Sequence, residues 1–175
     1  MRLALAEATA AAVEGEVPVG AVILGPAGEV VARGRNRREA EGDPTAHAEI
    51  VAIRAAARLA GGWRLDGYTL VATLEPCTMC AGAISAARIS RLVYAAADPR
   101  AGAVGSLWDV IRDPRVASWP EVIGGVLADE CLKAIRTFFS ERREPGQRYQ
   151  LMEYVRYALR RWSRLVAEGA RLESV

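Results

Sequence analysis

Cysteine and histidine are scarce in this sequence, which holds three cysteines and one histidine among 175 residues. Three is an odd number, and Cys77 and Cys80 form a close pair, so the chain has no disulfide framework of the kind that staples small secreted domains. We therefore expect a protein of the reducing cytoplasm.

Long apolar runs are also missing. No stretch approaches the roughly 18 consecutive apolar residues of a membrane span. Glu7 and Glu14 interrupt the apolar start of the chain, which favours an amphipathic helix over a signal peptide. The chain has no low-complexity segment and no repeat at a fixed period, so we expect a folded globular protein.

Excess charge is absent from most of the chain. Residues 1–143 contain 17 basic and 17 acidic side chains, and the net charge of +2 comes from residues 144–175. Bulk charge therefore does not predict a nucleic-acid binder. Local clusters at 33–38 and 142–143 are candidates for phosphate contacts, although such charge runs are more often solvated surface.

The pattern of apolar residues predicts an α/β fold in one main domain, residues 1–143. We expect helices over 2–14, 46–59, 77–87, 107–112 and 128–143. We expect strands over 17–24, 29–33, 68–74, 91–95 and 121–123. This alternation predicts a mostly parallel sheet covered on both faces. After a break at Pro145-Gly146, apolar residues recur at helical spacing, which predicts an appended amphipathic helix over 147–168 within residues 144–175.

Two segments carry the residue types of a metal site, and each opens a predicted helix. They are Pro-Thr-Ala-His-Ala-Glu at 44–49 and Glu-Pro-Cys-Thr-Met-Cys at 75–80. Cys77 and Cys80 are three residues apart, so both sulfurs can meet one ion, and a helix N-terminus favours the thiolates that zinc requires.

Alone, a single histidine is more often a cap or a core residue, and a cysteine pair is ambiguous among redox, structural and chance readings. Together they are informative, because a structural zinc needs a fourth ligand and Cys131 has no partner at ligand spacing. His47, Cys77 and Cys80 with an open position match a catalytic zinc, which lowers the pKa of water to about 7.

Glu49 indicates which reaction this site could catalyse, because it places a carboxyl group two residues after His47. Hydrolytic deamination must deprotonate the attacking water, protonate a ring nitrogen and protonate the departing ammonia, and one carboxyl group can do all three. Residues two apart do not share a helical face, so we expect the site to wrap around the start of the helix.

His-x-Glu followed by Pro-Cys-x-x-Cys is the signature of the zinc nucleobase deaminases. Over residues 2–143 the chain resembles one family of that superfamily, the bacterial tRNA-specific adenosine deaminases. The likeness covers 16–22, Asn36-Arg37, 43–50, 73–83, 105–107 and 127–131 leading to Phe138-Phe139.

The resemblance implies a three-layer cytidine deaminase-like fold, with a mixed five-stranded sheet covered by helices. The extra C-terminal helix expected over 147–168 has no counterpart in this family. It implies a homodimer that binds Zn2+ and converts the wobble adenosine of a tRNA anticodon stem-loop to inosine. The substrate-binding residues that it implies are Asn36, Ala48, Leu74 and Asp98. The RNA contacts that it implies are Arg100, Phe138, Phe139, Arg142 and Arg143.

Two departures from the family pattern lie in the expected RNA-facing loop. Ala97 stands where the family has a basic residue and Ala101 where it has a hydroxyl, which predicts weaker RNA contact.

Two alternatives remain open. The zinc motif alone equally suits a deaminase of free guanine, cytosine or cytidine, and a non-catalytic zinc-containing RNA-binding module is also possible. The appended helix has two possible roles as well. It packs within its own subunit or at a dimer interface, or its arginines extend the RNA-binding surface.

Overall fold

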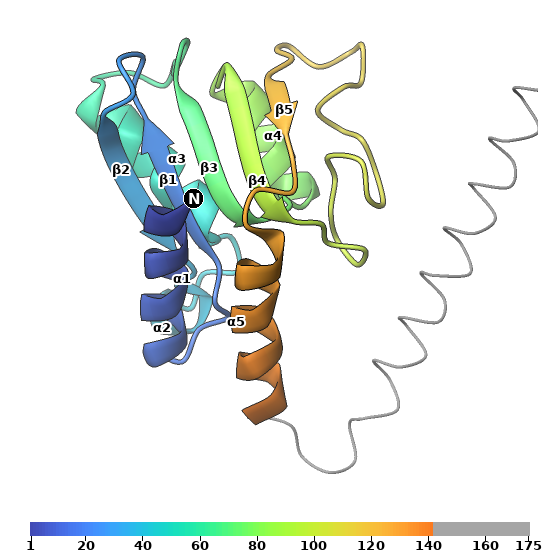
Figure 1. Ribbon diagram of the computed structural model, residues 1–175. Helices are drawn as coiled ribbons and strands as arrows, with labels where there is room; N and C mark the ends of the chain where they lie inside the picture. Colours follow the sequence, from blue (N-terminus) through green and yellow to red (C-terminus); the bar gives the residue numbers. More distant parts are fainter. Residues whose placement is uncertain (142–175) are drawn as a thin grey trace, which may run out of the picture. The chain divides into compact units, whose positions relative to one another are not determined.

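A five-stranded sheet in the order β2-β1-β3-β4-β5 forms the middle layer of the fold (Figure 1). The computed structural model describes residues 1–141, and residues 1–138 form one compact unit. The strands are β1 (Gly20–Leu24), β2 (Val30–Arg35), β3 (Thr69–Leu74), β4 (Arg91–Ala96) and β5 (Glu121–Ile123).

The sheet is mixed rather than mostly parallel, which corrects one expectation from the sequence. β1 runs antiparallel to β2 and to β3, whereas β3, β4 and β5 are mutually parallel. The reason lies in the first connection: a turn over residues 25–28, closed by a hydrogen bond from Gly25 N–H to the Glu29 carbonyl, folds β2 directly back on β1. The resemblance predicted this mixed sheet correctly.

Helices cover both faces of the sheet, as expected for three layers. The helices of the described residues are α1 (Arg2–Val13), α2 (Arg38–Glu41), α3 (Ala48–Leu59), α4 (Thr78–Ala86) and α5 (Ala128–Glu141). α1 lies on one face, and α3 and α4 lie on the other (Figure 1). The short α2 was not predicted.

Alternation along the strands explains how the layers pack. Val22 of β1 and Val71 of β3 form one apolar cluster with Ala4 of α1. Their strand neighbours Ala21, Ile23 and Leu70 point to the opposite face. There they join the larger core, to which α3 contributes Ala52 and α4 contributes Ile84. Because side chains alternate with a period of two, apolar residues at successive positions bury both faces of the sheet.

Gly34 allows β2 to lie directly against the start of α3. A Cβ atom at this position would lie 2.3 Å from the Ala48 carbonyl oxygen and 2.6 Å from the Ala52 nitrogen. Both distances are shorter than a van der Waals contact, so only glycine permits the approach. The close packing sets the first turn of α3 beside the end of β2.

The helix expected over 107–112 is wrong. This segment is irregular, with an isolated bridge between Val104 and Asp109. The N–H groups of Leu107 and Trp108 donate to the Gly102 carbonyl and that of Val110 donates to the Ala103 carbonyl, and not to carbonyls four residues earlier. The predicted boundary at 143, the break at 145–146 and the helix over 147–168 lie outside the described residues. Within residues 1–141, the helices are too short or too polar to cross a membrane.

Candidate metal centre and active site

The three expected metal ligands come from the starts of two neighbouring helices. His47 is the residue before the first turn of α3 and has extended backbone angles, and Cys77 holds the equivalent position before α4. Cys80 lies within the first turn of α4 and is fully buried. The N-termini of α3 and α4 therefore meet at one point, where the positive ends of both helix dipoles favour anionic ligands.

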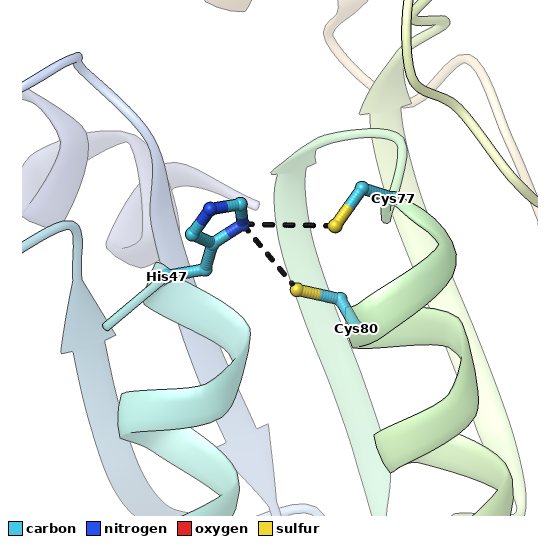
Figure 2. A group of neighbouring side chains, drawn as sticks. All are labelled: His47, Cys77 and Cys80. Atoms are coloured by element: carbon cyan, nitrogen blue, oxygen red, sulfur yellow. Dashed lines mark hydrogen bonds between the residues drawn. The ribbon is translucent and has the colours of Figure 1, made fainter. Parts of the chain in front are cut away.

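Figure 2 shows the His47 ring facing the two sulfur atoms of Cys77 and Cys80. Nδ1 of His47 lies 3.7 Å from Cys77 Sγ and 3.6 Å from Cys80 Sγ. The three ligand atoms all lie within 4.8 Å of one another. One nitrogen and two sulfurs at this spacing form a donor set that suits zinc, and three protein ligands are the number typical of a catalytic zinc.

Hydrogen bonds between the three ligand side chains shift their pKa values in opposite directions. Because it accepts a hydrogen bond from the Cys80 thiol and a further one from His47, Cys77 has a pKa lowered to about 3. The pKa of Cys80 is raised, first because its thiol donates to Cys77 and also because it is buried. The pKa of His47 is raised, chiefly by its hydrogen bond to Cys77.

Glu49 is buried on the first turn of α3, two residues after His47. Burial raises the pKa of its carboxyl group, and the neighbours that act on it electrostatically include His47, Cys77 and Cys80. The expected wrapping around the helix start is found: His47 is still extended and Glu49 is already helical, so both face the same point. A carboxyl group with a raised pKa beside a metal site is suited to exchanging protons.

Asn36 and Ala48 lie together at the edge of this site. The Asn36 side chain is buried and its Oδ1 accepts a hydrogen bond of 3.1 Å from the Ala48 N–H. Ala48 has no exposed surface. The amide of Asn36 is thereby oriented with its oxygen toward α3, and its NH2 group is what it can offer to another molecule.

Leu74 and Asp98 end β3 and follow β4, two neighbouring parallel strands. Leu74 is half-buried, and Asp98 Oδ1 accepts a hydrogen bond from the Arg100 N–H. Arg100 is exposed. Since parallel strands end at the same edge of a sheet, Leu74 and Asp98 share the edge that carries Cys77.

Sequence reasoning quoted Glu75 within its motif but gave it no role. Its carboxylate is buried and accepts hydrogen bonds from the segment that holds Asp98 and Arg100. Glu16, a second buried carboxylate, accepts bonds of 2.9 Å from the N–H groups of Glu39 and Ala40 at the start of α2. The sequence did offer one signal for a role of Glu75, because a charged residue directly follows the apolar strand β3.

The arginine cluster over 33–38 is largely neutralised within the protein. Arg35 lies 3.0 Å from Glu7 and 3.0 Å from Glu14. Arg33 pairs with Glu7, and Arg37 pairs with Glu14 and Glu41. The solvated-surface interpretation of this charge run is therefore favoured over a phosphate site.

The remaining expected RNA contacts lie near or beyond the end of the described chain. Phe138 and Phe139 are half-buried residues of α5. Arg142 and Arg143 lie outside the described residues.

Comparison with known proteins places these features in a family. The sequence profile of the cytidine and deoxycytidylate deaminase zinc-binding region matches residues 1–96. The tRNA-specific adenosine deaminase of Haemophilus influenzae is 48% identical over 144 residues, which cover 82% of this chain and 83% of that protein.

Solved structures agree. One described in a study of A-to-I editing by tRNA:A34 deaminases at the wobble position is 48% identical, with a TM-score of 0.74 over 77% of this chain and 96% of that one. The guanine deaminase of Nitrosomonas europaea is 26% identical, with a TM-score of 0.67 over 79% of this chain and 82% of its own.

Proposed function

This chain belongs to the cytidine and deoxycytidylate deaminase zinc-binding family, and we propose that it is a tRNA adenosine deaminase that makes inosine at the wobble position. The observation that carries the chemistry is the group of His47, Cys77 and Cys80. Glu49 lies beside this group, on the first turn of α3 that follows His47. The likeness to tRNA-specific enzymes is closer than that to guanine deaminase in both identity and TM-score, which favours the RNA substrate over a free base.

His47, Cys77 and Cys80 would hold zinc, which makes water a nucleophile near neutral pH. Glu49 would accept a proton as the water oxygen bonds to C6 of adenine, and would pass it to the ring nitrogen N1. The same carboxylate would then take the proton of the new C6 hydroxyl and give it to the amine, so that the C6–N bond breaks, ammonia leaves and C6 becomes a carbonyl. The raised pKa of buried Glu49 fits a group that both takes and gives protons.

Asn36 is proposed to recognise the base. Its Oδ1 is used by the Ala48 N–H, so its NH2 group would donate to an acceptor on the purine. Ala48 would act by holding Asn36 in that orientation, since Ala48 itself has no exposed surface. Leu74, Asp98 and Arg100 would line the substrate from the shared strand edge.

We also propose an oligomeric state and a cellular compartment for the protein. Exposed Trp108 and Trp119 leave apolar surface on the segment after β4, which supports the expected homodimer. All three cysteines are free thiols, and two of them are needed as metal ligands, which supports a reducing cytoplasm. Light scattering on the purified chain tests the dimer.

The test of the function is incubation of zinc-loaded protein with an anticodon stem-loop that carries adenosine at the wobble position. Inosine and ammonia should form in equal amounts. The same stem-loop with inosine already at that position should release no ammonia. Release of ammonia from free guanine or cytidine, with none from the stem-loop, would establish the free-base alternative. No release from any of these substrates by protein with a full zinc content would favour the non-catalytic module.

A further inference from the structure

Glu75 is a buried carboxylate that the proposed chemistry does not use. It stands between the end of β3 and the metal ligand Cys77, and only 2% of it is exposed. Its two oxygens accept four hydrogen bonds, all from residues 98–106. Oε2 accepts from the Asp98 N–H at 3.0 Å and from the Ser106 hydroxyl, and Oε1 accepts from the Val104 and Ser106 N–H groups, each at 3.0 Å.

The segment over 98–106 depends on these bonds because it forms no helix and belongs to no strand of the sheet. Buried N–H groups in such a segment need acceptors, and a carboxylate supplies them at both oxygens. The backbone packs so closely that a Cβ on Gly102 would lie 2.5 Å from the Glu75 Cδ. The Ala103 N–H also donates to the Pro76 carbonyl at 2.8 Å, which ties the segment to the residue before Cys77.

We infer that Glu75 is a positioning residue that fixes Asp98 and the 98–106 segment beside the start of α4, and thereby sets the affinity for RNA. The inference rests on the proposed function for its substrate. Glu75 and Cys77 are two residues apart, so one short stretch of chain places both a metal ligand and the segment expected to contact RNA. Loss of Glu75 should therefore weaken substrate binding and leave the chemical step at Glu49 intact.

Glu75→Gln is the sharpest test because it keeps the shape of the side chain and changes one oxygen to NH2. The amide oxygen can still serve two donors. Facing Val104 and Ser106 N–H, it keeps both bonds, and the Ser106 hydroxyl can turn to accept from the NH2 group. The Asp98 N–H can only donate, so it would face another donor. The variant should therefore release the Asp98 end of the segment selectively.

The first readout is hydrogen exchange of the full-length, zinc-loaded protein. Glu75→Gln should speed exchange in peptides covering residues 98–106 by about tenfold or more, as expected for the loss of a buried hydrogen bond. Exchange in α3 and zinc content should stay unchanged. Thr73→Val is the matched control, because Thr73 Oγ1 accepts a buried 3.0 Å bond from the Gly20 N–H elsewhere in the sheet. Unchanged exchange over 98–106 in Glu75→Gln would overturn the inference.

The second readout is steady-state kinetics with the anticodon stem-loop. Glu75→Gln should raise KM about tenfold with kcat within about twofold, and Thr73→Val should change neither. A fall in kcat at constant KM would overturn the inference. Should Glu75→Gln fail to fold, Ser106→Ala removes only the hydroxyl bond to Glu75 and should shift KM in the same direction by a smaller factor; an unchanged KM there would count against the proposal.

The two proposals can fail separately. If the wild-type protein forms no inosine, the proposed function fails, yet hydrogen exchange still decides whether Glu75 holds the segment. If the wild type is active and Glu75→Gln matches it in exchange and in KM, the function stands and the inference about Glu75 falls.

Discussion

His47 and Cys77 hold the same position in two different helices, each as the extended residue before the first turn. Their backbone angles are φ −73°, ψ 152° and φ −72°, ψ 176°, and His47 Nδ1 lies 3.7 Å from Cys77 Sγ. The metal centre is thus assembled from two helix starts on one edge of the sheet. Its affinity for zinc depends on how readily these ligands release their protons.

Zinc binding should release about two protons at pH values below the raised pKa of His47. The pKa values of His47 and Cys80 are both raised, so both groups must lose a proton to the metal, whereas Cys77, with a pKa of about 3, has already lost its own. Affinity should therefore fall as the pH falls. Above the pKa of His47 the release should drop to about one proton. Calorimetry in buffers of different ionisation enthalpy measures the number directly.

Cys131→Ser is the control for this experiment, since Cys131 lies on α5 and is the one cysteine outside the ligand group. It should leave the proton count unchanged. Release of three protons near pH 6 by the Glu49→Gln protein, in which the neighbouring carboxyl group cannot contribute, would mean that Cys77 is a neutral thiol in the metal-free protein, contrary to the hydrogen bonds that it accepts.

Glu49→Gln should lower turnover by about 10²- to 10⁴-fold while zinc stays bound. The amide keeps the size of the side chain but cannot shuttle protons, and general acid–base catalysis contributes about 10² to 10⁴ in rate. Inosine formation and zinc content, measured on the same sample, check this. Glu29→Gln, in the exposed turn between β1 and β2, should leave both unchanged. Near-normal inosine formation by Glu49→Gln would exclude the proposed proton transfers.

The residues of the metal centre were predictable because their chemistry is visible in their types and spacing. His47, Cys77, Cys80 and Glu49 each stand at the start of an amphipathic or alanine-rich segment, and helix starts are marked in sequence by short-range signals. The exact first residue was not predictable: the helices were expected from 46 and 77, and they begin at Ala48 and Thr78. That shift leaves His47 and Cys77 extended and lets them turn toward each other.

The segments around the site were less predictable, because their conformation depends on partners far away in sequence. α2 is too short to show periodicity, and its first N–H groups bond to Glu16, 23 and 24 residues earlier. A helix was expected over 107–112, yet the N–H groups of Leu107, Trp108 and Val110 bond to the carbonyls of Gly102 and Ala103. No local pattern records such contacts.

Gly34→Ala should destabilise the protein and weaken zinc binding. The new methyl group would meet the Ala48 carbonyl at 2.3 Å, and relief requires movement of the first turn of α3, which carries Glu49 and follows His47. Overpacking of this kind costs about 1–3 kcal/mol. Thermal unfolding and zinc titration measure the two effects. Gly62→Ala is the matched control, since a Cβ there meets nothing within 4 Å. Equal melting temperatures for the two variants would contradict the close packing of β2 on α3.

Glu7→Gln combined with Glu14→Gln should strengthen RNA binding and make it more sensitive to salt. These glutamates neutralise Arg33 and Arg35 through pairs of 3.0 to 3.8 Å, whereas Arg37 keeps its pair with Glu41 in the variant. Arginines released from such pairs can contact phosphates, and each new contact with a single strand adds about 0.7 to the slope of log affinity against log salt. Fluorescence anisotropy with the anticodon stem-loop at several salt concentrations measures that slope.

Bulk charge must be separated from the charge of this cluster. Asp66→Asn combined with Glu121→Gln changes the net charge by the same amount, and it frees Arg64 and Arg91 elsewhere on the surface. If both double variants steepen the slope equally, net charge alone is responsible. A steeper slope only for the Glu7 and Glu14 variant means that the 33–37 cluster faces the RNA and that its glutamates limit binding. An unchanged slope for that variant would show that the cluster points away from the RNA, and would leave the strand edge around Asp98 as the main binding surface.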